Sequence, residues 1–261
     1  MIRAVRVKTI TVYPIKSLDG IVVPAARILS GGALEHDREF ALLDENGKFI
    51  NGKRDARIHR IRAEYDLERL MVSLRVVEDS QSVTFHMLEQ RKELERWFED
   101  FFGGPVFIRR NQETGFPDDL ESPGPTIVGS ATLQKVGSWF GISDPLEARR
   151  RFRPTIELAT EESFWEDRLF GISGDTVQFQ VGNVSILGVN PCQRCVVPSR
   201  HPSTGGVMRD FQTVFVERRK AMLPSWAEQS RFNHYYRLSV NTRIPPSEIG
   251  KWIRVGDVVI V

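Results

Sequence analysis

The sequence has 261 residues, of which 41% are hydrophobic and 27% charged, a composition typical of folded rather than disordered proteins. Its formal net charge of +2 is too close to neutral to favour nucleic acid as a partner. Two cysteines cannot form a disulfide framework, and such sparing use predicts a cytoplasmic protein. No apolar run approaches the roughly 18 residues that cross a bilayer, so we expect no membrane span.

Short strand patterns dominate the first half of the chain. Apolar and basic residues alternate near the N-terminus, which indicates a strand and not a signal peptide. Asn46-Gly47 predicts a hairpin turn, with residues 48–50 as the return strand. A helix is predicted at 89–102, where five apolar side chains share one face before Gly103-Gly104-Pro105. The other strands expected in this half are residues 5–12, 21–23, 41–43, 63–67, 71–77 and 83–85.

A polar segment rich in Gly, Pro and Asp, residues 112–125, predicts a loop and a domain boundary. Beyond it, helices are predicted at 130–141, with Ser130 as the N-cap, and at 145–152. A further helix is predicted between Asp210 as its cap and Pro224. The strands expected in this half are residues 126–128, 153–158, 177–179, 184–187, 235–240 and 258–261. Many short strands with a few helices predict an α+β or β-barrel architecture, mostly β, and not a doubly wound sheet.

Both cysteines lie in residues 190–200, NPCQRCVVPSR, as Cys192 and Cys195. Four interpretations compete for them. They could form half of a zinc site with His201 and His234, although the spacing is unusual. They could form a dithiol redox pair, although the residues that follow do not resemble a helix start. They could be two idle, buried cysteines, or one thiolate could bind a soft metal whose other ligands come from an anionic cofactor.

The last interpretation requires an anion-binding set elsewhere in the chain. Lys16, Ser17, Arg38 and Arg153 are candidates because each lies near a break between predicted strands. An isolated arginine at a strand end often forms only a surface salt bridge, so the residues alone leave this set open. The basic runs at 149–151 and 218–220 are most simply interpreted as solvated faces.

Five short motifs occur along the chain: YPIKS at 13–17, DREF at 37–40, FRP at 152–154, PCQRC at 191–195 and VGDV at 255–258. In these residues and in their order the sequence resembles the MOSC family, in the branch with a MOSC N-terminal β-barrel domain. That branch includes the mitochondrial amidoxime reducing component and bacterial YcbX-like proteins. The resemblance implies a MOSC-type β-barrel at residues 112–261 and a smaller, β-rich N-terminal domain at 1–111, whose residues 1–40 could pack with either part.

The same resemblance implies a molybdenum cofactor, a pyranopterin dithiolene that chelates molybdenum and carries a phosphate. Cys195 matches the family's catalytic cysteine and metal ligand. Thr155 stands where the family has asparagine, and the loop after the cysteines carries Arg200 and His201 where relatives often have acidic residues. The cofactor-binding residues implied are Lys16, Ser17, Arg38, Arg153, Thr155, Cys192 and Arg194.

The implied activity is that of an oxidoreductase that reduces the N–O bond of small N-hydroxylated compounds. Its electrons would come from a separate flavoprotein, ferredoxin or cytochrome, because the sequence contains no Rossmann glycine fingerprint and no cysteine cluster for an iron–sulfur centre. Two alternatives stay open: a cofactor-binding or sulfur-carrier protein that uses the Cys195 thiol without reductase activity, and a member that has lost the cofactor. The family is also associated with pyridoxal phosphate binding.

Overall fold

The structure is a computed structural model that describes residues 4–261. Within that range it contains fifteen strands and four α-helices, which confirms the α+β, mostly-strand fold class. No helix in the described range is both long and apolar enough to cross a membrane. The helices are α1 (Arg91–Phe102), α2 (Ser130–Ser138), α3 (Pro145–Phe152) and α4 (Phe211–Ala221). The strands are β1 (Arg6–Val12), β2 (Ile21–Val23), β3 (Ala25–Arg27), β4 (Phe40–Leu43), β5 (Ile61–Asp66), β6 (Met71–Val76), β7 (Val83–His86), β8 (Phe107–Arg110), β9 (Ile127–Gly129), β10 (Ile156–Ala159), β11 (Val177–Val181), β12 (Val184–Gln193), β13 (Arg237–Arg243), β14 (Trp252–Arg254) and β15 (Val259–Ile260).

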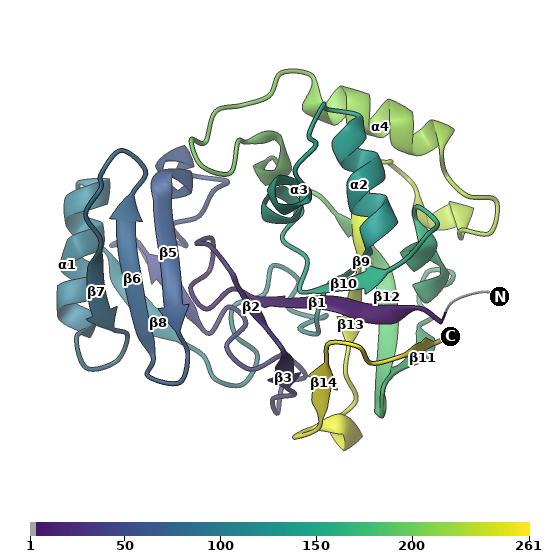
Figure 1. Ribbon diagram of the computed structural model, residues 1–261, viewed down its shortest axis with the longest axis horizontal. Helices are drawn as coiled ribbons and strands as arrows, with labels where there is room; N and C mark the ends of the chain where they lie inside the picture. Colours follow the sequence, from purple (N-terminus) through teal and green to yellow (C-terminus); the bar gives the residue numbers. More distant parts are fainter. Residues whose placement is uncertain (1–3) are drawn as a thin grey trace.

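The largest sheet closes on itself as a barrel. Its strands follow the order β15-β11-β12-β13-β9-β10-β1-β2, and only the β9–β10 pair is parallel. The sheet closes because the backbone N–H of Val7 donates to the carbonyl of Asp257 at 2.9 Å and that of Val259 donates to Val5 at 2.8 Å. The start of β1 and the end of the chain therefore lie side by side (Figure 1).

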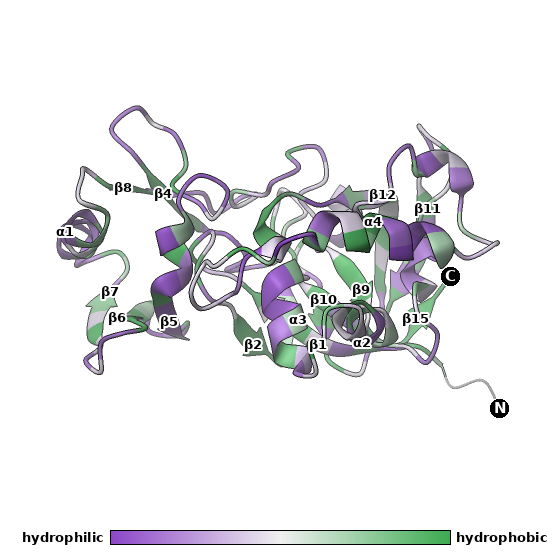
Figure 2. Ribbon diagram, turned by 90° about the horizontal axis from the view of Figure 1, so that it is seen from above, coloured by the Kyte–Doolittle hydropathy of each residue, from purple (hydrophilic) through white to green (hydrophobic). Residues whose placement is uncertain are grey.

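The interior of the barrel is filled by aliphatic side chains from nearly every strand. Ile10, Ile127, Ile156, Ile186 and Val240 are all fully buried there. Figure 2 shows the corresponding strands, β9 and β10 among them, coloured as hydrophobic inside a more polar periphery. A closed sheet requires such a pattern, because the side chains on one face of each strand point into the barrel and those on the other face point outward.

A second, smaller unit packs around its own core. It contains the sheet β5-β6-β7, the pair β4–β8 and helix α1, and it lies at the left of Figure 1. Leu94 and Phe98 on the inner face of α1 pack against Leu74 and Val72 of β6. Ile15, only three residues beyond β1, already belongs to this core. The chain thus passes from the barrel into the smaller unit within one short loop.

Residues 4–40 are shared between the two units. β1 and β2 belong to the barrel sheet, and β3 pairs with β14 near the C-terminus. Ile15 and Phe40 instead pack in the core of the smaller unit. The segment 112–125 that follows β8 contains no strand or helix and leads into β9. The first motif, residues 13–17, therefore lies where the chain first passes from the barrel into the smaller unit.

Three local predictions are wrong. Residues 48–50 do not form a return strand, because β4 pairs with β8 and only a single bridge joins Leu43 to Phe49. Ser130 is the first residue of α2 and not its cap, since its hydroxyl donates to the carbonyl of Thr160. Asp210 occupies the N-cap position of α4, but with φ +58° its side chain does not cap the helix.

Candidate functional site

A cavity of about 700 Å³ lies between the two units, a volume typical of small-molecule sites. Its walls come from the loop after β1, the β5–β6 hairpin, the loop around Asp118, the end of α3 and the end of β12. Seven of the eight residues singled out in the sequence line it: Lys16, Ser17, Arg38, Arg153, Cys192, Arg194 and Cys195. Side chains far apart in the chain are thus brought to one place.

The cavity is strongly basic. Ten Lys or Arg residues line it against five Asp or Glu residues, although the whole chain has a net charge of only +2. A concave wall with one dominant charge focuses the electric field and attracts ligands of the opposite sign. The lining therefore favours an anionic ligand.

Lys16 lies in the loop that joins the barrel to the smaller unit. Its backbone N–H donates to Phe40 at 2.7 Å, and the next residue, Ser17, adopts a left-handed conformation with φ +74°. The Lys16 ammonium donates to the carbonyl of Phe116 and to Oδ1 of Asp118, both at 2.7 Å. Burial lowers the pKa of Lys16, and the carboxylate of Asp118 opposes that shift. The pair is open to solvent on one side, because the Asp118 side chain is 65% exposed.

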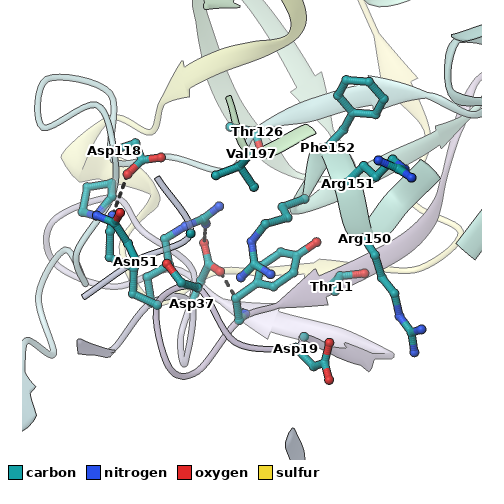
Figure 3. A pocket seen from close by; sticks show the side chains of 18 of the residues that line it. Thr11, Asp19, Asp37, Asn51, Asp118, Thr126, Arg150, Arg151, Phe152 and Val197 are labelled. Atoms are coloured by element: carbon teal, nitrogen blue, oxygen red, sulfur yellow. Dashed lines mark hydrogen bonds and ion pairs between the residues drawn. The ribbon is translucent and has the colours of Figure 1, made fainter. Parts of the chain in front are cut away.

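Tyr13 forms a platform between two guanidinium groups. The Arg153 guanidinium carbon lies 4.0 Å from the ring centroid, and that of Arg38 lies 5.3 Å from it. Asp37 accepts from the Tyr13 backbone at 3.1 Å and forms an ion pair with Arg38 (Figure 3). The Tyr13 hydroxyl donates to the carbonyl of Pro154 at 3.1 Å, and burial raises its pKa to about 12. The ring is therefore a fixed, neutral support for both cations.

Arg153 and Arg194 each present a buried N–H group without a partner. Arg153 ends α3 in a left-handed conformation with φ +50°, and its Nη2 forms no hydrogen bond within residues 4–261. Arg194 donates from Nη2 to the carbonyl of Phe152 at 2.6 Å and from Nη1 to Sγ of Cys192 at 3.3 Å, but its Nε has no partner in the described chain. A buried unpaired donor costs about 1–3 kcal/mol, more for a charged group, so these atoms are suited to an anionic ligand.

The two cysteines differ in their surroundings. Cys192 lies near the end of β12, and its sulfur accepts a hydrogen bond from Nη1 of Arg194. Cys195 lies just beyond the strand and lines the same cavity. Both are free thiols and partly buried. Both cysteines therefore line the cavity, and Arg194 contacts the sulfur of Cys192.

The zinc and dithiol interpretations find no support in this geometry. Among residues 4–261, no group of three or more His, Cys, Asp or Glu side chains could hold a metal ion, so His201 and His234 do not complete a site with the cysteines. The helical segment after the pair is only a three-residue 3-10 turn, Val197–Ser199. A thioredoxin-type pair at the start of an α-helix is therefore absent from this part of the chain.

Thr155 is the one predicted site residue that does not line the cavity. Its side chain is buried, and its hydroxyl donates to Asp37 at 3.4 Å. Thr155 lies behind the residues that line the cavity and contacts Asp37. Its position does not favour a direct contact with a ligand, and that contact stays a prediction.

Sequence reasoning missed His59 and Arg62, which also line the cavity. His59 Nε2 is buried without a partner in residues 4–261, and burial, together with Arg153 and Arg200, lowers its pKa to about 4. Arg62 holds the carbonyls of His59 and Pro202 at 2.6 and 2.9 Å. No motif marks either residue; the alternation of β5 was the only available signal, since it places Arg62 on one face of that strand.

Residues 4–105 match the family described as MOSC N-terminal beta barrel domain. Residues 4–105 are therefore similar to a MOSC N-terminal beta barrel domain. This confirms the resemblance derived from the sequence, and the matched MOSC region contains the first two motifs, with Lys16, Ser17 and Arg38.

Two curated plant proteins are similar to this chain over most of its length. A molybdenum cofactor sulfurase of Solanum lycopersicum is 25% identical and aligns with 97% of the chain, and one of Oryza sativa subsp. japonica is 24% identical and aligns with 78%. The chain spans only about a third of their length, 35% and 29%. Among solved structures, the YUAD protein of Bacillus subtilis aligns over 98% of this chain and 94% of its own, with 8% identity and a TM-score of 0.39.

Proposed function

We propose that the cavity binds a molybdenum cofactor and that the protein uses it to reduce small N-hydroxylated compounds. One observation carries this proposal: Cys195 shares a basic cavity with the unpartnered, buried donors of Arg153 and Arg194. A soft-metal cofactor with an anionic tail needs a thiolate and cationic donors in the same place. The similarity to molybdenum cofactor sulfurases gives further support.

The residues present fit such a group. The thiolate of Cys195 would be the single protein ligand of the metal, and a dithiolene would supply further sulfur ligands. Lys16, Ser17 and Arg38 would hold the anionic tail, while Arg153 and Arg194 would satisfy their free N–H groups on it. When bound, the cofactor supplies two-electron redox chemistry, and the protein binds and orients it.

The overall reaction takes two electrons and two protons to a hydroxylated nitrogen. The N–O bond breaks, the nitrogen gains one proton, and the hydroxyl takes the other proton and leaves as water. The electrons come from a separate donor protein, and the protons come from solvent at the mouth of the cavity. Tyr13, neutral and fixed by Pro154, holds the arginines in place but does not exchange a proton near pH 7.

The test is reductase activity on an aromatic amidoxime, with a chemical electron donor, for protein produced in a host that makes the cofactor. Cys195→Ser should abolish turnover, whereas Cys192→Ser, the matched control in the same segment, should retain much of it. Equal activity of wild type and Cys195→Ser, or no activity in fully loaded wild type, would contradict the proposal.

A second candidate is a cofactor-binding or sulfur-carrier protein that uses the Cys195 thiol without reductase activity. The similarity to proteins named molybdenum cofactor sulfurase favours it specifically. It predicts a persulfide on Cys195 that mass spectrometry detects, together with no turnover of amidoximes. A persulfide-free, active protein would exclude it.

A further inference from the structure

One end of the cavity carries arginines that the proposed cofactor site does not use. Arg62 on β5 and Arg75 on β6 lie directly opposite each other in the antiparallel ladder, and both line the cavity. Like charges in opposed positions of a sheet destabilise it. Such a pair is best explained by a counter-ion that lies between the two side chains.

A third arginine reaches the same end from the other unit. Arg150, in the last turn of α3, is exposed and lines the cavity. Burial lowers the pKa of Arg62, the charge of Asp19 opposes that shift, and the charges of Arg150 and Arg75 lower the pKa further, so the three arginines act on one another. Figure 3 shows Arg150 on the side where Asp19 lies and Arg151 turned elsewhere, consistent with the ion pair of Arg151 with Glu147.

The acidic groups nearby compensate only part of this cluster, because Asp19 forms an ion pair with Arg62 alone. Oδ1 of Asp19 lies 3.3 Å from Nη1 of Arg62, but that N–H is not aligned for a hydrogen bond and has no partner within the described residues. The other oxygen of Asp19 accepts from the backbone of Ala63 at 3.1 Å. Glu64 is exposed and stands opposite Ser73. Arg75 and Arg150 form no ion pair or hydrogen bond with any side chain or carbonyl in residues 4–261.

The opposite end of the cavity is compensated. There Asp37 pairs with Arg38, and Asp118 pairs with Lys16 and, at 3.6 Å, with Lys53. Apart from Arg153 and Arg194 of the proposed cofactor site, the arginines of the lining without an ion pair lie where the β5–β6 hairpin faces α3. Guanidinium groups in such a cluster bind phosphate or carboxylate through paired N–H···O bonds.

We propose that Arg62, Arg75 and Arg150 bind an anionic group of the substrate, a phosphate or a carboxylate, so that the preferred N-hydroxylated substrates are anions. This inference rests on the proposed reductase function for the identity of the substrate. The anion subsite itself does not depend on the metal. The cluster selects substrates by charge, while the chemistry takes place at Cys195.

The first test is a titration of the purified protein with inorganic phosphate at constant ionic strength. Binding is measured as the shift in melting temperature. The variant is Arg75→Gln with Arg150→Gln. The control is Arg69→Gln, which removes an exposed charge from the turn of the same hairpin, outside the cavity. We expect about tenfold weaker phosphate binding in the double variant and wild-type binding in the control. Equal binding in all three proteins would overturn the subsite.

The second test separates a substrate anion from the cofactor phosphate. KM is compared for a neutral aromatic amidoxime and for the same compound with a carboxylate, and molybdenum content is measured in parallel. The double variant should raise KM about tenfold for the carboxylated compound only, with molybdenum content unchanged. A loss of molybdenum would mean that the cluster holds the cofactor and would overturn the inference. If no protein reduces amidoximes, the reductase proposal fails, and the phosphate titration still decides the subsite.

Discussion

Arg153 lies against the face of Tyr13, with its guanidinium carbon 4.0 Å from the ring centroid. Tyr13 is the first residue after β1, and Arg153 ends α3, so the contact joins the two parts of the chain that frame the cavity. The stacking fixes the guanidinium plane while Nη2 keeps a buried, unpaired N–H. Arg153 is thus held in position before a ligand binds.

Replacement of Arg153 by glutamine should weaken cofactor retention. The change removes the charge and the free donor, while the amide keeps a polar side chain in the cavity wall. We expect about tenfold weaker retention, measured as molybdenum per chain after gel filtration at increasing salt.

Arg168→Gln is the matched control for that variant. Arg168 also stacks on an aromatic ring, that of Trp226 at 4.2 Å, but it lies outside the cavity lining. Its replacement should leave molybdenum content unchanged. If the two variants retain the metal equally well, Arg153 does not hold the cofactor.

Tyr13→Phe should lower the stability of the fold by about 1 kcal/mol. The hydroxyl donates to the carbonyl of Pro154 at 3.1 Å in a buried position, and phenylalanine leaves that acceptor unpaired. The ring still supports Arg38 and Arg153. Urea unfolding measures the change, with Tyr235→Phe as the control, because the Tyr235 hydroxyl makes no hydrogen bond in the described residues. A Tyr13→Phe protein as stable as wild type would show that this bond contributes nothing.

Glu166→Gln should remove a pH dependence of stability. Burial, and then the charge of Asp167, raises the pKa of Glu166 from 4.5 to about 7. Its Oε2 accepts from the Thr132 hydroxyl at 2.7 Å and from the Gly129 backbone at 3.2 Å, and glutamine can accept both bonds. The glutamine variant therefore mimics the protonated carboxyl at every pH.

The direction of the effect follows from the raised pKa. Below about pH 4.5 the carboxyl is protonated in both the folded and the unfolded chain, and its contribution to stability is fully present. As pH rises toward 7 the unfolded chain releases the proton first, so wild type loses stability relative to Glu166→Gln. Urea midpoints at pH 5 and pH 8 measure this difference, with the exposed Glu162→Gln as control. A difference between wild type and Glu166→Gln that does not change with pH would contradict the assignment.

The local elements with a clear periodicity were predictable from the sequence. α1 and α3 lie where the apolar spacing and Pro145 indicated them, because the signals for both are contained within the helix itself. The β4–β8 and β3–β14 pairs were not predictable, since each partner lies far along the chain and the choice between partners depends on packing. The expected return strand at 48–50 failed for that reason.

The candidate site shows the same limit. Spacing alone left the cysteines and the basic residues unconnected, and only the resemblance to a family predicted that they would meet. The contact of Thr155 with Asp37 joins residues 118 positions apart in the chain, and no sequence pattern specifies it. Arg62 and Arg75 lie opposite each other because of the register of β5 against β6. The alternation of apolar and polar residues predicts which side chains share a face of the sheet, but it does not determine which residues of the two strands pair.

The central claim is that Cys195 anchors a molybdenum cofactor in the basic cavity. The most direct measurement is molybdenum and pterin content per chain, for wild type, Cys195→Ser and Cys192→Ser produced in a host that makes the cofactor. We expect about one molybdenum and one pterin per chain in wild type and in Cys192→Ser, and loss of the metal in Cys195→Ser with the fold intact. Stoichiometric molybdenum in Cys195→Ser, or none in wild type, would contradict it.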